Sequence, residues 1–501
     1  MEIESYRPLL VLIVSLIGAA LIVVNRDDEN KREACSVAAA GLKFLLVISM
    51  IPAILEGNVY HFTLFTFLEE VTITLKVDAL GIIFATVASF LWLVTTFYSI
   101  GYMRAHKEQS QTRYYTCFAV TLSMTMGVAF SGNVLTLYLF YEMLTLITYP
   151  LVAHSETDEA FAGANKYLFY LLGTSKAFLL AAMLITYAIA GTLEFQPGGL
   201  FPADANSTAI VVVFFLFLAG IGKAAIMPLH AWLPAAMVAP TPVSALLHAV
   251  AVVNTGVFSV LRIIFHVFGV DLMRSLHLGT ATAILASFTI LMASMYAITR
   301  DNLKARLAYS TVSQLSYIIL GAALLSPSGM AGGVIHIANH AFSKITLFFA
   351  AGSIFVASHK TNISQMNGIG RQLPWTMTAF AIGTLSMIGV PPSAGFVSKW
   401  YLAVGTIEAD QIAILIVLLT STLLNAIYFV PIVFNAFFKP PPELALAHAL
   451  AGDKDGHGEE AHEVKEVSPF IVGPLMVTAV ISLILGMFPD IFFSLVKVVI
   501  G

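Results

Sequence analysis

Long apolar runs, separated by short polar connections, repeat along almost the whole chain. A helix needs about 20 apolar residues to cross the hydrocarbon core of a bilayer. The runs predict fourteen such helices, at roughly 8–25, 34–55, 79–103, 114–131, 133–153, 162–190, 208–235, 241–266, 279–299, 306–325, 329–357, 375–404, 410–436 and 469–498. Because the connections are short, we expect an all-α polytopic membrane protein whose helices form one bundle.

Two segments depart from this pattern. Residues 60–74 alternate and are rich in aromatic side chains, which favours a short surface hairpin. Residues 439–468 are rich in proline and then charged, which is typical of a solvated loop. Three of its side chains could bind a metal, but no histidine or carboxylate spacing recurs there, so we interpret the segment as a linker. They are His448, His457 and His462.

The composition agrees with a membrane protein. Of 501 residues, 58% are hydrophobic and 11% are charged. A soluble fold of this size could not bury so much apolar surface. The net charge of −4 lies in the connections and identifies no partner, so nucleic acid is not expected. Cys35 and Cys117 both lie in apolar runs, which predicts neither a disulfide framework nor a cysteine-based metal site. The first apolar run lacks a basic flank and a cleavage site, so we expect a retained helix rather than a signal peptide.

The distribution of basic residues orients the predicted bundle. The connections on one face carry fourteen lysines and arginines: Arg26, Lys31, Arg32, Arg104, Lys107, Arg113, Arg300, Lys304, Arg306, Lys360, Arg371, Lys439, Lys454 and Lys465. The other face carries five: Arg7, Lys76, Arg262, Arg274 and Lys497. The positive-inside rule places the first face in the cytoplasm and both termini outside. We expect the cytoplasmic (inner) membrane of a prokaryote.

The remaining six basic residues all lie within predicted spans, and all are lysines: Lys43, Lys166, Lys176, Lys223, Lys344 and Lys399. A charged side chain at the centre of a spanning helix costs about 2.5–3.5 kcal/mol on insertion scales. A buried lysine can lose its proton near neutral pH, whereas an arginine effectively cannot. We expect Lys43 and Lys166, near helix ends, to snorkel to the surface. The others, with apolar turns around them, are candidates for proton transfer.

Acidic and imidazole groups accompany these lysines. Glu142 is a lone carboxylate in the middle of the fifth predicted helix, and pairing it with Lys223 or Lys176 would lower the burial cost of both charges. Such a pair could act in transport or only fix helix packing. Along the eleventh predicted helix, three titratable residues are spaced by four and share one face, which suits a proton relay. They are His336, His340 and Lys344.

His248, in the eighth predicted helix, adds a further imidazole. A rival role for these histidines is haem ligation. Two histidines on one helix face cannot supply opposite axial ligands, so haem would require His248 opposite His336 or His340.

Prolines interrupt two of the predicted helices beside lysines. Pro228 cannot donate a hydrogen bond to the carbonyl of Ala224, which interrupts the seventh helix next to Lys223. Broken helices are tolerated at membrane depth only against protein or a wet cavity. Free carbonyls, room for water and a titratable lysine together form the beginning of an ion path.

The twelfth predicted helix repeats this arrangement. Pro391 and Pro392 release the carbonyls of Met387 and Ile388, and Lys399 follows two turns later. Two interrupted helices, each with a buried lysine and five spans apart, indicate an internal repeat of inverted topology.

The segments "GKAAIMPLHAWLPAAMVAPTPVSALLHA", "RDNLKARLAYSTVSQLSY", "HIANHAFSKITLFFAAGS" and "GVPPSAGFVSKW" resemble the antiporter-like subunits shared by Mrp-type cation/proton antiporters and respiratory complex I. The resemblance covers about residues 78–435. It implies fourteen helices with two inverted five-helix repeats and broken seventh and twelfth helices. The implied parts are 1–113 (helices 1–3 with a hairpin), 114–266 (first repeat), 279–436 (second repeat), 437–468 (cytoplasmic loop) and 469–501 (last helix).

The resemblance also implies roles for residues. Glu142 and Lys223 match the ion pair that gates proton movement in the family. A central chain matches His248, His336, His340 and Lys344, and Lys399 matches its terminal residue. Two positions depart from the pattern: Asn254 stands where several members have lysine, and Lys176 has no counterpart.

The expected function is a proton-translocating subunit of a multi-subunit membrane complex. The chain lacks the long lateral helix of the largest complex I subunit of this kind, which favours Mrp D-like Na⁺/H⁺ antiport. The second candidate is a proton-pumping subunit of a redox-driven complex, such as complex I, a membrane hydrogenase or a formate hydrogenlyase. A non-transporting scaffold, a quinone or haem redox subunit, and a subunit that energises inorganic-carbon uptake are further candidates. We expect no cofactor, metal, or redox or hydrolytic active site; the expected partners are other membrane subunits, protons, Na⁺ and lipid.

Overall fold

The computed structural model describes residues 1–68, 71–440 and 464–500, which are mainly helical. The first helices are α1 (Arg7–Val24), α2 (Glu29–Ile48), α3 (Ile51–Leu55), α4 (Ala79–His106), α5 (Gln111–Ala129), α6 (Val134–Val152), α7 (Asp158–Thr174), α8 (Leu180–Ala190), α9 (Ser207–Gly220), α10 (Trp232–Ala235), α11 (Thr241–Ala249) and α12 (Val252–Arg262). The rest are α13 (Val270–Ser275), α14 (Leu278–Ile298), α15 (Leu303–Ala323), α16 (Pro327–Ser358), α17 (Ile369–Gln372), α18 (Pro374–Ile388), α19 (Ala394–Glu408), α20 (Ile412–Phe438), α22 (Pro469–Met487) and α23 (Asp490–Ile500).

Helices occupy all fourteen predicted spans, which confirms the all-α polytopic fold class. Among the described residues, ten helical segments are long and apolar enough to cross a bilayer. The other four predicted spans are also helical. Two of them are broken, at 208–235 and 375–404, and the other two are α5 and α15, which carry many hydroxyl-bearing residues.

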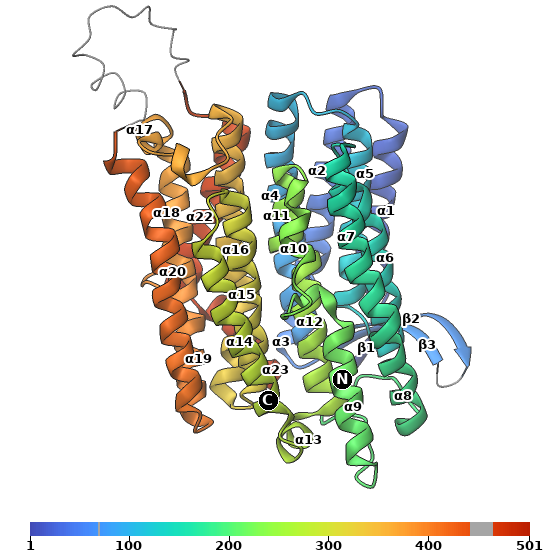
Figure 1. Ribbon diagram of the computed structural model, residues 1–501. Helices are drawn as coiled ribbons and strands as arrows, with labels where there is room; N and C mark the ends of the chain where they lie inside the picture. The colour runs from blue at the N-terminus through green and yellow to red at the C-terminus, as the bar shows by residue number, and fades with distance from the viewer. Residues whose placement is uncertain (69–70, 441–463, 501) are drawn as a thin grey trace, which may run out of the picture.

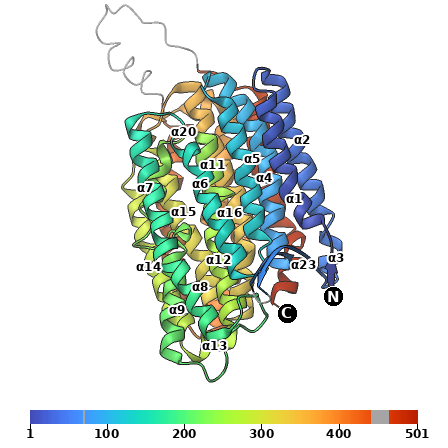
Figure 2. The same ribbon diagram turned by 90° about the vertical axis from the view of Figure 1, so that its right-hand side faces the viewer.

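The long helices stand side by side in one bundle (Figures 1 and 2). Both termini lie at one end, here called the terminal end. The α1–α2, α4–α5, α14–α15 and α16–α17 connections lie at the opposite end, here called the basic end because they carry most of the basic loop residues. Helices α6 and α8 form one flank of the bundle, α18 and α20 form the other, and α11 packs against α16 near the centre (Figure 1).

A small sheet lies at the terminal end. Strand β2 (Val59–Leu68) pairs antiparallel with β3 (Val71–Val77), and β1 (Glu2–Glu4) pairs parallel with β2. This confirms the hairpin predicted over residues 60–74. An ion pair of 2.9 Å between Lys76 and Glu2 joins the two outer strands.

Three spans in the first half of the chain contain a break or an irregular turn. A π-helical turn, η1 (Ser175–Leu179), separates α7 from α8. Helix α9 ends at Gly220 and is followed by the 3₁₀ turn η2 (Gly222–Ala224). The predicted break therefore exists, but it begins eight residues before Pro228. The break between α11 and α12, at Val250 and Ala251, was not predicted because no proline or glycine marks it.

The prediction that Lys43 snorkels is wrong. Its side chain on α2 is fully buried, with Nζ 5.0 Å from the centre of the Trp92 ring of α4. Helix α2 packs against α4, so the side chain lies between the two helices, away from the surface. Lys166 is exposed, although it lies in the middle of α7 and not near a helix end.

Candidate functional site

Lys223 lies in the η2 turn, in the break between α9 and α10, and is fully buried. Its Nζ donates a hydrogen bond to the carbonyl of Tyr141 (2.8 Å) and another to the hydroxyl of Thr145, both on α6. The same Nζ lies 3.2 Å from the centre of the Tyr141 ring. The phenol of Tyr141 in turn accepts from the backbone N–H of Lys223 (3.1 Å). One face of α6 therefore holds both the main chain and the ammonium group of this residue.

Gly256 on α12 allows the Lys223 turn to approach so closely. A Cβ atom at residue 256 would lie 2.3 Å from the carbonyl carbon of Lys223 and 2.3 Å from the nitrogen of Ala224. Only a glycine leaves room for that backbone contact.

Glu142 follows Tyr141 on α6 but does not bond to Lys223. Among the described residues the two side chains form no ion pair, and the buried Oε1 of Glu142 has no hydrogen-bond partner. Successive side chains on a helix point about 100° apart, so a group held by Tyr141 and Thr145 lies off the direction of Glu142. The expected contact pair is therefore not formed in this structure.

Lys176 was the other candidate partner for Glu142. It lies in the π-helical turn η1 and is exposed on the flank formed by α7 and α8. Within the described part of the chain it forms no ion pair with Glu142. The structure thus brings neither lysine into contact with the carboxylate.

His248 is fully buried near the end of α11, directly before the break. Its Nδ1 lies 3.2 Å from the hydroxyl of Thr311 on α15, and that hydroxyl also donates to the carbonyl of Leu307 (3.0 Å). Nδ1 of a neutral ring then carries the proton, and Nε2, which has no partner among the described residues, is free to accept one. Asn254 on α12 donates to the carbonyl of Ala249 (2.7 Å) and so caps the broken end of α11.

Lys344 lies in the middle of α16 and is fully buried. Its Nζ donates to the hydroxyl of Ser310 on α15 and lies 3.4 Å from the carbonyl of Leu307. His340, one turn away, is also buried, and neither of its ring nitrogens has a partner in the described structure. Buried polar atoms without a protein partner are ordinarily met by water.

His336 is the third member of the predicted α16 stripe, with its ring 6.2 Å from that of His340. Nε2 lies 3.1 Å from Oε1 of Gln314 and Nδ1 lies 2.7 Å from the hydroxyl of Ser398. Both nitrogens are thus engaged by protein groups, which argues against His336 as a haem ligand. Among the described residues no cluster of three histidine, cysteine or carboxylate side chains could hold a metal ion; His448, His457 and His462 lie outside them.

Lys399 on α19 donates to the carbonyls of Met387 (2.8 Å) and Ile388 (3.0 Å) at the end of α18. These are the two carbonyls that the sequence predicted to be released by the proline pair. Its Nζ lies 5.0 Å from the ring centre of Tyr317, and that ring lies 5.7 Å from the ring of His336. Tyr317 therefore lies between the α16 stripe and Lys399.

Helix α15 supplies the polar groups that connect these residues. Of four polar side chains of α15, three lie one, four and seven residues after the first, so all four share one side of the helix. They are Ser310, Thr311, Gln314 and Tyr317. Residue-by-residue reasoning missed this face, although its signal was a cluster of hydroxyl and amide side chains inside an otherwise apolar span.

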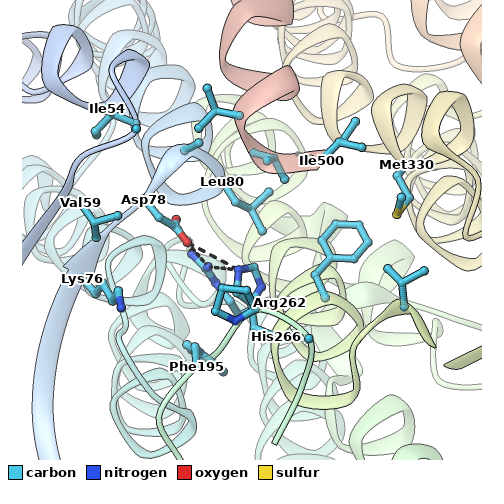
Figure 3. Close-up of a pocket in the computed structure, with 18 of the residues that line it drawn as sticks. Ile54, Val59, Lys76, Asp78, Leu80, Phe195, Arg262, His266, Met330 and Ile500 are labelled. Carbon is cyan, nitrogen blue, oxygen red and sulfur yellow. Dashed lines mark hydrogen bonds and ion pairs between the residues drawn. The ribbon is translucent and has the colours of Figure 1, made fainter. Parts of the chain in front are cut away.

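A further polar cluster lies at the terminal end (Figure 3). Arg262 donates to both carboxylate oxygens of Asp78, one at 2.8 Å, and His266 Nε2 lies 3.8 Å from the carboxylate. Burial raises the pKa of Asp78, but the charge and hydrogen bonds of Arg262 lower it more, so the net pKa is well below the usual range. Arg262, predicted from the sequence to lie on the face with few basic residues, is 2% exposed and lies in the last turn of α12.

This cluster borders a cavity of about 520 Å³ between the β-hairpin, α12 and the end of α23. Its wall includes Met330, two turns before His336 on α16. The cavity thus lies at the terminal-end side of the central stripe.

The fold and the buried network of lysines and histidines together define an antiporter-like membrane subunit. Comparison with known sequences gives the same class of protein. Residues 131–425 match the family profile described as NADH:quinone oxidoreductase/Mrp antiporter, transmembrane. Residues 68–115 match the profile for the N-terminus of chain 5 of NADH-ubiquinone oxidoreductase (complex I). Since the first match spans more than half of the chain, the protein belongs to the NADH:quinone oxidoreductase/Mrp antiporter family.

Individual relatives come from respiratory complexes. The chain is 31% identical over 445 residues to the NADH-quinone oxidoreductase subunit N of Desulforudis audaxviator, with 88% of each chain covered. It is 29% identical over 497 residues to subunit L of Escherichia coli, with 95% of this chain and 76% of the relative covered.

Two solved structures share the fold. A chain of the Mrp complex from Dietzia sp. DQ12-45-1b superposes with a TM-score of 0.86 at 23% identity, covering 99% of this chain and 96% of that one. A chain of the membrane-bound sulfane sulfur reductase, an archaeal respiratory membrane complex, gives 0.84 at 23% identity, covering 99% and 97%. Both neighbours are parts of multi-subunit membrane complexes.

Proposed function

We propose that this chain moves protons across the membrane as one subunit of a multi-subunit complex. The observation that carries the proposal is a series of basic groups inside the bundle, all buried except the half-buried Lys399 and linked through α15 in its second half. Buried lysines and histidines change protonation more readily than any other cationic side chains, and water can bridge the gaps between their unpartnered atoms. The series consists of Lys223, His248, Lys344, His340, His336 and Lys399.

The two ends of the series have different roles in this proposal. Lys223 changes its affinity for a proton as Glu142 approaches or withdraws, since each pKa unit corresponds to about 1.4 kcal/mol of interaction. The open arrangement of Glu142 and Lys223 is one of the two states that such a gate needs. Lys399 receives the proton at the other end, beside free carbonyls that favour its charged form.

Lys176 supports the assignment to a larger complex. It is exposed in the middle of the segment from Asp158 to Ala190, about 27 Å of helix from one end and about 21 Å from the other, which is farther than a lysine side chain can snorkel. An exposed ammonium at that depth costs about 2.5–3.5 kcal/mol in lipid. Another membrane subunit with a carboxylate at the same depth is the partner that removes this cost.

The finer assignment is Mrp-type Na⁺/H⁺ antiport in a prokaryotic cytoplasmic membrane, with the basic end in the cytoplasm and both termini outside. Residues 114–266 and 279–436 are the two inverted repeats in this proposal. The structural match to a chain of the Mrp complex from Dietzia sp. DQ12-45-1b, which covers 96% of that chain, supports this assignment. A proton-pumping subunit of a redox-driven complex is the second candidate, because the relatives in Desulforudis audaxviator and Escherichia coli are subunits of NADH-quinone oxidoreductase.

Proton flux in vesicles that contain the whole complex tests the proposal. Lys223→Ala and Lys399→Ala should each abolish the flux at matched assembly, whereas the exposed Lys166→Ala should leave it unchanged. Intact flux in Lys223→Ala and Lys399→Ala would instead indicate a non-transporting scaffold. Driving the same vesicles with a Na⁺ gradient or with an electron donor then separates antiport from redox-driven pumping.

A further inference from the structure

A second cavity, of about 280 Å³, opens at the basic end. Its wall combines the end of α4 and the connection after it with the first residues of α11 and α15 and the last turns of α16. The titratable side chains that line it are Tyr102, His106, Glu108, Lys304 and Lys360. Glu108 is the one carboxylate among the residues that line this cavity.

The cavity lies on the basic-end side of the central residues of the proposed proton path. Each of three helices has a residue in the cavity wall. Seven positions along the same helix lies a residue of the group formed by His248, Thr311 and Lys344. Seven residues are almost two full turns, so both positions share one helix face about 10.5 Å apart. The pairs are Thr241 and His248 on α11, Lys304 and Thr311 on α15, and Ala351 and Lys344 on α16.

Glu108 is poorly solvated for a carboxylate. Its side chain is 20% exposed, and its closest basic group among the ion pairs of the described residues is His154, with Nε2 3.9 Å away. His154 is itself almost fully buried, and neither of its ring nitrogens has a hydrogen-bond partner among the described residues. Burial raises the pKa of Glu108, and burial together with the charge of Arg113 lowers the pKa of His154. Burial therefore outweighs the opposing effect of His106 on the pKa of Glu108.

We propose that this cavity is the proton-intake site of the basic end, with Glu108 as the group that takes protons from water. The inference rests on the proposed function. The Glu108 carboxylate accepts a proton from a hydronium ion, which leaves as water, and becomes a neutral acid. It then releases that proton through water in the cavity toward Nε2 of His248, which restores the carboxylate and leaves an imidazolium.

The neighbouring groups in this cavity favour a proton carrier that is neutral when it holds the proton. Lys304 donates to the carbonyl of Ala239 (2.6 Å), and burial lowers its pKa to about 7, so this group at the cavity wall gains and loses its charge near neutral pH. Lys360 also lines this space and adds positive charge whether Lys304 is protonated or neutral. A neutral carboxylic acid is not repelled by these groups, so Glu108 can carry a proton where hydronium cannot remain.

The test compares Glu108→Gln with Glu159→Gln, an exposed carboxylate at the same end that does not line the cavity. Proton flux from the basic side, in vesicles with the whole complex, should fall about tenfold or more in Glu108→Gln and recover partly in Glu108→Asp. Glu159→Gln should match the wild type. Wild-type flux in Glu108→Gln would overturn the inference while leaving the proposed function intact; absence of flux in the wild type would overturn both.

A second measurement does not depend on the carboxylate. Ser155 lines the cavity at the protein surface, so a Ser155→Cys variant, in a background with Cys35 and Cys117 replaced by serine, can be blocked by a bulky thiosulfonate that does not cross membranes. Added from the basic side, the reagent should inhibit flux several-fold, and reduction should restore it. Full labelling without inhibition would contradict the inference.

Discussion

His248 and Lys344 come from different helices but hydrogen-bond to consecutive residues of a third helix. His248 contacts the hydroxyl of Thr311, and Lys344 contacts the hydroxyl of Ser310, both on α15. These contacts join a titratable group of the first half of the chain to one of the second half. Helix α15 is therefore a structural part of the proposed proton path, and the two neighbouring hydroxyls connect its two halves.

Removing one of these hydroxyls should interrupt the path with little change in shape. Thr311→Val keeps the volume of the side chain but leaves Nδ1 of His248 without its acceptor. We expect proton flux to fall about tenfold or more, with assembly preserved. Ser313→Ala is the matched control, because Ser313 lies on the other side of α15 and bonds to the carbonyl of Ile290. Equal flux in the two variants would show that the Thr311 hydroxyl plays no part.

Gly256 provides a test of how the Lys223 turn is positioned. A methyl group at this position would lie within 2.3 Å of the Lys223 main chain, so Gly256→Ala must displace the turn. Overpacking of this kind costs about 1–3 kcal/mol of stability. We expect lower thermal stability in detergent together with reduced proton flux.

Gly473→Ala in α22 is the control for that substitution, since a Cβ atom there meets nothing within 4 Å. Replacing a helical glycine by alanine at an open position raises stability by about 0.5–1 kcal/mol. Its flux should be unchanged. If both glycine variants behaved alike, the close contact between α12 and the Lys223 turn would not matter for function.

Much of this arrangement could be predicted from the sequence. The spans follow from hydrophobic runs, and the released carbonyls of Met387 and Ile388 follow from the lack of an N–H in proline. These carbonyls accept hydrogen bonds from the half-buried ammonium group of Lys399. These features depend on residues close in the chain, which is why local patterns indicate them.

The features that were missed depend on contacts between distant segments. The open geometry of Lys223 results from its packing on Tyr141, and the ion pair of Arg262 joins residues 184 positions apart. A hydropathy pattern shows that a charge lies near a helix end, but it does not show which helix packs over it. For the same reason Lys43, near a helix end, proved to be buried under Trp92.

The Asp78–Arg262 pair should dominate stability at the terminal end. Asp78→Asn leaves the buried guanidinium uncompensated, a change that typically costs about 3–5 kcal/mol. Because the pKa of Asp78 is lowered, its contribution is present above the unfolded value near 3.8 and is lost as pH falls through the folded pKa. Thermal unfolding should show the deficit at neutral pH. The double variant with Arg262→Met should recover much of it; no recovery would mean that the pair is not the cause.

Glu108 and Glu156, both at the basic end, should show opposite pH dependence of stability. Burial raises the pKa of Glu108, so its favourable contribution is complete below the unfolded value near 4.5 and is lost as pH rises through the folded pKa. Hydrogen bonding to Arg113 and its charge lower the pKa of Glu156, whose contribution is present above 4.5 and lost as pH falls. In thermal melting scans from about pH 4 to 8, the stability of Glu108→Gln relative to the wild type should rise with pH. The relative stability of Glu156→Gln should fall over the same range.

Lys176 predicts the contact with a neighbouring subunit. If a partner carboxylate faces this ammonium at mid-membrane depth, Lys176→Glu should place two negative charges together and prevent assembly. Lys176→Leu removes the charge without creating repulsion, so the complex should form with reduced stability. Lys166→Glu, on the same helical segment but closer to its first residue, should assemble normally. Co-purification of the other subunits with the tagged chain measures all three variants. Normal assembly of Lys176→Glu would mean that this flank faces lipid or a subunit without a carboxylate at that depth, since a facing carboxylate would repel the new charge.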